Sequence, residues 1–441
     1  MARIYPFRAL RYNPSLVRVE DCVTQPYDKI SPSMQQAYYA RSPYNLVRII
    51  LGLPELFDEA GTADVYTRAA RDFAQWRASG ILAAENEPCI FAYSQRFTVP
   101  GTRETVERQG LIALGELYDY SAGVVFRHEQ TLSKPREDRL NLLRATRAHF
   151  GQIFMLYSDP AQTVEKLIYT KNDVPEIELV DEYDVLHRVW KVSDPATINM
   201  VLGVLENKKL IIADGHHRYE TALKYSKECA PRHPGGYSER SASSLPQPAY
   251  PEAAVMMTLV NMDGQGLTIL PTHRLVHSLP QFNPAAFLAA ASPYFTTRAL
   301  TGEAPDLLSA LDAAGPRSLV AVTRVGAHLL TPRPDEVDRA LAEVSSRKRQ
   351  LDVVVLHQLV LEQLLGISSQ AIREQTNLRY LRDAVDAVSQ VRQGLADVAF
   401  LMHPVTLDQL REVTFAGEVM PQKSTDFFPK LLSGLTIYAL D

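Results

Sequence analysis

The stretch Lys209–Leu223 constrains the fold of this chain more than any other part of the sequence. Lys209–Ala213 is a short apolar run of the kind that forms a buried strand, and Asp214 and Gly215 interrupt it. The apolar residues that follow the interruption recur at helical spacing. The sequence therefore predicts a strand, a tight turn and a helix in direct succession.

The predicted turn lies where the carboxyl end of a strand meets the amino end of a helix, where free backbone N–H groups and the helix dipole favour an anion. The sequence places a carboxylate, two imidazoles and a guanidinium there: Asp214, His216, His217 and Arg218. Asp-Gly is also a common turn, and Asp214 could simply cap the helix, so for this residue alone capping and chemistry carry equal weight. The whole cluster indicates a functional site.

Length and composition limit the class of protein. A chain of 441 residues can form two or three domains, each with its own core. The net charge of -5 argues against a broad nucleic-acid-binding surface. Three widely spaced cysteines form neither a disulfide framework nor a metal knuckle, and no apolar run has the length of a signal peptide or a membrane span. We expect a cytoplasmic protein that does not associate with membranes.

Changes in residue composition along the chain predict two mixed α/β portions. Residues 1–280 are expected to form a catalytic α/β domain, and a Pro-, Gly- and Ser-rich stretch over 231–251 is expected to be a mobile loop inserted in it. Residues 281–441 are expected to form a second, smaller α/β domain that folds back on the first. The clearest predicted elements are a helix over 32–40, a strand over 42–50, a hairpin over 89–120, a strand over 152–157, a helix over 195–206 and a strand over 253–262.

Three further polar clusters supply groups that suit phosphate. One spans residues 128–144, a second follows a strand at 272–274, and a third lies at 423–430. Lysine with two neighbouring hydroxyls can hold a phosphate, although the glycines of a Walker A loop are missing. A solvated loop followed by a salt-bridged helix explains the first cluster equally well. The candidate phosphate- or substrate-binding residues are His128, Thr131, Arg139, Arg144, His273, Arg274, Lys423, Ser424 and Thr425.

The histidine spacing bears on metal binding. His128-Glu129 and His216-His217 are not at the i, i+4 spacing that presents two ligands from one helical face, so a catalytic zinc ion is not expected. Magnesium is easier to accommodate, because it takes one or two carboxylates together with substrate phosphates.

Several short motifs occur in a fixed order along nearly the whole chain. They are Pro6–Leu10, Pro26–Asp28, Pro43–Asn45, His128–Thr131, Asp138–Leu140, Ala213–Arg218, Leu270–Arg274 and Pro421–Thr425. In this order they resemble a bacterial and archaeal family of domains of unknown function, number 1015 in that series and often labelled ParB-like. The stretch over 231–251 carries none of these motifs and looks like an insertion.

The Asp-Gly-His-His-Arg turn is also similar to the ParB/sulfiredoxin-like fold, including the free-serine kinases built on it. This resemblance implies that Asp214 orients or deprotonates the serine hydroxyl or holds Mg²⁺, and that His216, His217 and Arg218 contact phosphate oxygens of the donor. It leaves the second catalytic acid open, with Glu129 and Asp28 as candidates.

The resulting hypothesis is a small-molecule phosphotransferase, a free L-serine kinase that forms O-phosphoserine from pyrophosphate, ADP or ATP with Mg²⁺. Dephosphorylation of phosphoserine, a ParB-like nucleotide- or nucleic-acid-binding module without catalysis, and a site that has lost catalysis are the alternatives. The expected partners are serine or phosphoserine and the donor, with a homodimer left open as the assembly.

Phosphoryl transfer requires cations around the transferred group and a carboxylate near the nucleophile. The clusters at 128–144, 214–218, 272–274 and 423–430 together contain these groups. We therefore predict that they meet around one phosphate-sized hollow.

Overall fold

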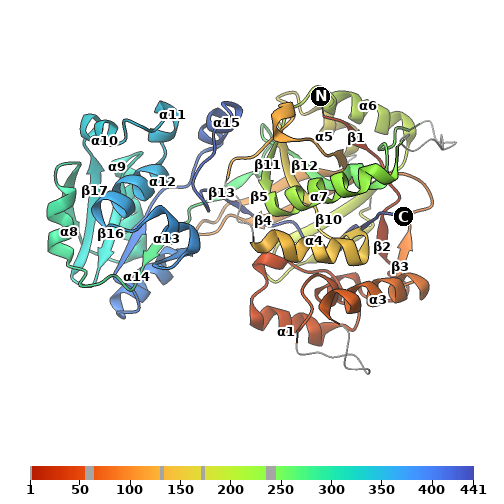
Figure 1. The fold of residues 1–441 in the computed structure, drawn as a ribbon, viewed down its shortest axis with the longest axis horizontal. Coiled ribbons are helices and arrows are strands. Elements are labelled where there is room, and N and C mark those ends of the chain that lie inside the picture. Colours follow the sequence, from red (N-terminus) through yellow and green to blue (C-terminus); the bar gives the residue numbers. More distant parts are fainter. Residues whose placement is uncertain (1, 55–63, 130–133, 170–173, 235–244) are drawn as a thin grey trace. The chain divides into compact units, whose positions relative to one another are not determined.

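The computed structural model describes residues 2–54, 64–129, 134–169, 174–234 and 245–441 (Figure 1). The chain divides into two compact units: 1–127, 131–268 and 429–441 form the first, and 128–130 and 269–428 form the second. The sequence predicts a boundary near residue 280, whereas the boundary in the structure follows residue 268. Residues 429–441 belong to the first unit. Each unit is mixed α/β, as predicted.

A nine-stranded mixed sheet forms the centre of the first unit. Its main path runs in the order β6 (Val125–Phe126), β11 (Leu210–Asp214), β8 (Ile153–Tyr157), β12 (Ala254–Asn261), β5 (Thr105–Glu116), β4 (Ile90–Thr98), β10 (Leu186–Val192) and β9 (Ile177–Val180). β1 (Ile4–Tyr5) pairs with β5, and the predicted hairpin is the antiparallel pair of β4 and β5. Strand β11 is parallel to β6 and antiparallel to β8.

One face of this sheet is covered by helices α5 (Thr163–Ile168), α6 (Pro195–Leu205) and α7 (His216–Cys229). Alternate strand residues such as Leu111, Met155 and Ile212 pack against them, because successive side chains of a strand point to opposite faces. The helix predicted over 195–206 is confirmed as α6. Figure 1 shows α7 beside α4 (Lys134–Thr146).

A second hydrophobic cluster of the first unit gathers α2 (Val47–Ile50), α3 (Val65–Ala78) and β2 (Leu10–Tyr12), with α1 (Pro32–Arg41) adjoining α2. The predicted strand over 42–50 is wrong. A short helix begins at Val47, whose N–H donates to the Asn45 side chain at 3.0 Å. The apolar run of α2 is buried on a helical turn, because a short apolar run alone does not distinguish a strand from a buried helix.

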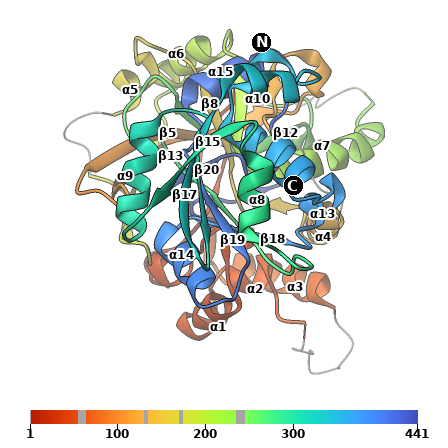
Figure 2. The same cartoon turned by 90° about the vertical axis from the view of Figure 1, so that its left-hand side faces the viewer.

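The second unit contains a six-stranded sheet (Figure 2). Its order is β15 (Phe295–Leu300), β17 (Gly326–Pro332), β16 (Leu319–Thr323), β19 (Val398–Leu401), β14 (His273–Val276) and β18 (Leu378–Leu381). Helices α9 (Ala304–Ala314) and α14 (Ala384–Arg392) pack on one face, whereas Phe287 of α8 (Pro284–Ala291) meets Phe400 of β19. Figure 2 shows α8 and α9 on opposite sides of this sheet.

The remaining helices of the second unit are α10 (Pro334–Ala340), α11 (Ser346–Arg349), α12 (Asp352–Val354), the π-helical segment η6 (Val355–Leu364), α13 (Ser369–Glu374) and α15 (Leu407–Phe415). Residues 235–244 of the loop expected over 231–251 lie outside the described residues. Across the described ranges, no helix combines the length and the apolar character needed to cross a membrane.

Candidate active site

Asp214 is the last residue of β11, and His216 is the first residue of α7, as the sequence predicts. Gly215 joins them with a φ of +92°, a conformation that residues with a side chain rarely adopt. A Cβ atom at position 215 would also lie 3.1 Å from the Arg218 guanidinium. Glycine therefore allows Arg218 to fold back over the turn toward Asp214.

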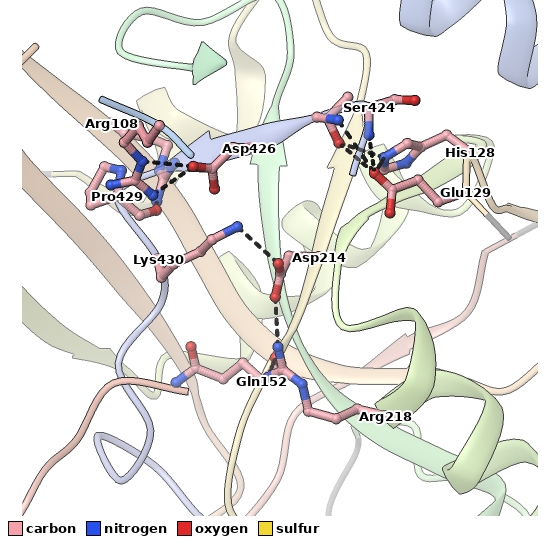
Figure 3. Close-up of polar contacts among 12 residues, drawn as sticks. Arg108, His128, Glu129, Gln152, Asp214, Arg218, Ser424, Asp426, Pro429 and Lys430 are labelled. Carbon is pink, nitrogen blue, oxygen red and sulfur yellow. Dashed lines mark hydrogen bonds and ion pairs between the residues drawn. The ribbon is translucent and has the colours of Figure 1, made fainter. Parts of the chain in front are cut away.

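Two cations hold the Asp214 carboxylate (Figure 3). Lys430 Nζ donates to Oδ1 at 3.0 Å, and an Arg218 Nη atom donates to Oδ2 at 2.8 Å. Arg218 also donates to the Gln152 carbonyl, which fixes the orientation of its guanidinium. The Asp214 side chain is 20% exposed and the Lys430 side chain 8% exposed, so water screens this cluster only in part.

The charge state of Asp214 follows from these neighbours. Burial acts to raise the pKa of the carboxyl group, but the positive charges of Lys430, Arg218 and Lys29 outweigh it and hold the pKa well below its ordinary value. Asp214 is therefore ionised at neutral pH, and the cluster as a whole carries a net positive charge. Such a cluster attracts an anion.

Lys430 is the last residue of the predicted cluster at 423–430 but was not among the predicted site residues, and the sequence prediction missed Arg108, which holds the segment of Lys430. Arg108 is 1% exposed and donates to the Gln95 side chain and, at 2.6 Å, to the Pro429 carbonyl. Gln95 Nε2 in turn donates to the Lys430 carbonyl at 2.8 Å. A lone lysine between Phe427-Phe428 and Leu431-Leu432 is the signal that could have identified Lys430.

A pocket adjoins Arg218 on the first unit. Tyr27, Arg139, Thr221 and Ser433 are among its lining residues. The Arg139 guanidinium lies 4.2 Å from the centre of the Tyr27 ring and donates to Asp138 and to the Ile50 carbonyl. The structure thus brings the predicted Arg139 and Arg218 to one pocket.

The other candidates of the first unit differ in their surroundings. His216 is buried and His217 is half-buried at the start of α7, and Asp28 is exposed beside Tyr27. Arg144 lies on the surface in a two-pronged ion pair with Glu228, with contacts of 2.8 and 3.1 Å, so we do not retain it as a phosphate ligand. Thr131 falls outside the described residues.

The predicted residues Glu129, Ser424 and Thr425 lie together in the second unit. Glu129 Oε1 accepts from the backbone N–H groups of Ser424 at 3.0 Å and Thr425 at 3.3 Å (Figure 3). His128 is buried, and its Nε2 lies 2.7 Å from the Thr425 hydroxyl. The Ser424 hydroxyl donates to the Pro421 carbonyl. The predicted phosphate-binding turn is therefore engaged with a carboxylate of its own unit.

His273 and Arg274 also belong to the second unit, where both are buried. Arg274 donates to the Lys423 carbonyl at 3.0 Å and to His357 Nε2 at 3.1 Å. The buried guanidinium therefore holds the backbone of the turn at 423–425 on its interior side. Burial, together with the charge of Arg274, lowers the pKa of His273 to about 4. A neutral His273 adds no positive charge for a phosphate.

We expect the stability of the second unit to fall in mild acid because of His273. Between pH 7 and pH 5 the unfolded chain protonates this histidine near its ordinary pKa of 6.5, whereas the folded chain keeps it neutral down to about 4. The unfolded state then binds more protons, so the free energy of unfolding falls as pH falls, by about 2 kcal/mol over this range. In urea unfolding, the free energy of unfolding of His273→Asn should fall by about 2 kcal/mol less than that of the wild type between pH 7 and pH 5. The half-exposed control His328→Asn should show the same fall as the wild type. An unchanged pH dependence in His273→Asn would contradict this origin.

The residues around Asp214 do not fit a protein-held magnesium ion. Both carboxylate oxygens are already bound by cations. In the described part of the chain, no three His, Cys, Asp or Glu side chains are grouped so as to hold a metal ion. Asp214 is therefore a poor candidate for the metal ligand that the resemblance implies.

The comparisons with known proteins give one family and several distant structures. The model of the family described as "Protein of unknown function (DUF1015)" matches residues 4–363. No match to a curated protein is found. A free serine kinase variant in complex with ADP is 11% identical, with a TM-score of 0.35, and the match covers 71% of this chain and 89% of that chain.

Two further solved structures are similarly distant. A conserved hypothetical protein from Pyrococcus furiosus is 12% identical with a TM-score of 0.33, over 69% of this chain and 87% of that chain. SbnI with a C-terminal truncation, from Staphylococcus aureus, is 10% identical with a TM-score of 0.35, over 73% of this chain and 85% of that chain. At these identities and TM-scores, the likenesses carry no functional argument.

Proposed function

Because this chain belongs to the DUF1015 family, whose description assigns no activity, we propose its function from the residues around Asp214: it is a small-molecule phosphotransferase that acts on free L-serine and forms O-phosphoserine. The observation that carries the proposal is the ionised Asp214 carboxylate between Lys430 and Arg218 at a strand-to-helix turn. Serine as the acceptor rests on the resemblance of this turn to free-serine kinases.

The proposed roles follow from charge. Transfer of a phosphoryl group spreads negative charge over its equatorial oxygens, so cations fixed beside it lower the barrier. Lys430 and Arg218 are the cations that would face these oxygens. The cations that lower the pKa of Asp214 make its carboxylate a weaker base. We therefore assign Asp214 to accepting a hydrogen bond from the serine hydroxyl and to holding the two cations apart.

The donor is proposed to be pyrophosphate, ADP or ATP. As the serine oxygen bonds to the terminal phosphorus, the P–O bond to the rest of the donor breaks, so phosphate, AMP or ADP leaves, and the hydroxyl proton passes to a phosphate oxygen of the donor. A magnesium ion would be carried by the phosphates of the donor, because both oxygens of Asp214 are engaged.

The direct test is to incubate the purified full-length protein with L-serine, Mg²⁺ and, in separate reactions, pyrophosphate, ADP or ATP. We expect O-phosphoserine, detected by mass spectrometry, with at least one donor. The reverse reaction should consume O-phosphoserine. Absence of phosphoserine formation with all three donors, together with absence of its consumption, would refute the proposal.

Replacing Lys430 by methionine tests the assignment of the activity to this site. The change keeps most of the side-chain volume but removes one cation, so we expect the rate of phosphoserine formation to fall about 10²- to 10³-fold. The matched control is Lys224→Met on the exposed side of α7, which should retain the wild-type rate. Equal rates in the two variants would show that the activity lies elsewhere.

A further inference from the structure

The turn at Lys423–Thr425 has the geometry of an anion-binding nest. Lys423 adopts a φ of +55°, and the N–H groups of Ser424 and Thr425 then converge on one oxygen of Glu129. The Thr425 hydroxyl lies 3.5 Å from the same oxygen. Three donors thus surround a single negatively charged oxygen.

Cations of the second unit surround the same turn. The buried Arg274 binds the Lys423 carbonyl from within, and its charge interacts with that of Glu129. The Lys423 side chain is exposed. Arg382 pairs with Asp426 one residue beyond the turn, at 2.7 Å. These three cations outnumber the two carboxylates, so the turn suits an anion of higher charge than a single carboxylate.

Glu129 can leave the nest without a change in the backbone. The backbone of this segment is fixed separately, because Met420 N donates to the His128 carbonyl at 2.8 Å and a bridge joins Glu129 to Met420. The carboxylate itself sits at the end of a flexible side chain, and rotation of that side chain would free the three donors. His128 would still hold the Thr425 hydroxyl.

We propose that this nest is a binding site for a phosphate oxyanion and that Glu129 acts as an internal competitor which the ligand displaces. A phosphate oxygen would take the place of Glu129 Oε1, and a second oxygen would remain for the Lys423 ammonium group. The proposal concerns the second unit alone and does not depend on phosphotransfer at Asp214.

The test measures binding of inorganic pyrophosphate by calorimetry, in the full chain that carries Lys430→Met, so that one of the two cations at Asp214 is absent and the remaining Arg218 is balanced by the carboxylate. Addition of Glu129→Ala should tighten binding at least tenfold, because the competing carboxylate is removed. Glu129→Gln keeps an oxygen acceptor for the two N–H groups without the charge, so it should tighten binding to a smaller extent and guards against misfolding of the alanine variant. A parallel titration with ADP distinguishes a free phosphate compound from a nucleotide as the source of the oxyanion.

Lys423→Ala assigns any gain to this turn. When Lys423→Ala is combined with Glu129→Ala, it should cancel most of the gain in pyrophosphate affinity. Lys348→Ala, elsewhere in the second unit, should leave that gain intact. The proposal is overturned if folded Glu129→Ala and Glu129→Gln proteins bind pyrophosphate and ADP no more tightly than the parent. It is equally overturned if the gain survives Lys423→Ala, since the anion would then bind at another place.

Discussion

Replacement of Asp214 by asparagine is expected to slow phosphoserine formation about 100-fold while it strengthens the binding of pyrophosphate about tenfold. The rate falls because the amide replaces one of the two acceptor oxygens by an NH2 group that faces a cation, so Lys430, Arg218 and the serine hydroxyl lose their fixed positions. Binding becomes stronger because the variant removes a negative charge from a cluster that already attracts anions. Steady-state kinetics and calorimetry would measure the two effects on the same protein.

A lower rate of phosphoserine formation together with a higher affinity for pyrophosphate distinguishes an active site from an ion pair that only stabilises the fold. Loss of a structural pair would weaken binding and activity together, or change only stability. Asp335→Asn, at an exposed position of α10, is the matched control and should change neither quantity. If Asp214→Asn retained the full rate, the role assigned to the carboxylate would be wrong.

The second large effect is expected for Arg108→Met. Arg108 does not touch Asp214, but it holds the Pro429 carbonyl and the Gln95 side chain, and Gln95 holds the Lys430 carbonyl. Its removal leaves these buried acceptors without their donor, so the free energy of unfolding should fall by about 2 kcal/mol. Displacement of Lys430 by even about 1 Å should slow the reaction about 10²-fold.

A double-mutant cycle tests whether Arg108 acts through Lys430. If it is a positioning residue for Lys430, the variant with both Arg108→Met and Lys430→Met should react no more slowly than Lys430→Met alone. The exposed Arg103→Met, in the turn between β4 and β5, serves as the control for loss of an arginine. If the double variant instead lost rate by the product of the two single-variant factors, Arg108 would contribute independently of Lys430.

The sequence was sufficient to predict the local fold around Asp214. The apolar run of β11, the Asp-Gly interruption and the helical spacing after it are local signals, and the structure has strand, turn and helix at these residues. Local signals gave the wrong element over 42–50, because a short apolar segment can be buried either as a strand or as a helix.

The partners of the site residues were harder to predict, because they depend on which distant segments the sheet brings together. Lys430 lies more than two hundred residues from Asp214 along the chain, and no spacing pattern connects the two. Conversely, residues 128–129, 274 and 423–425 do meet, but in the second unit and around Glu129 rather than around an empty hollow. A meeting of these residues with Asp214 stays a prediction.

The division of the first unit has a consequence for synthesis of the protein. The strand that carries Asp214 and the segment that carries Lys430 belong to one unit, yet the whole of 269–428 is translated between them. A ribosome-bound chain can therefore form most of the first sheet long before its lysine emerges. During that interval Asp214 can pair with Arg218 but not with Lys430, so the turn gains its net positive charge only after residues 269–428 have been translated.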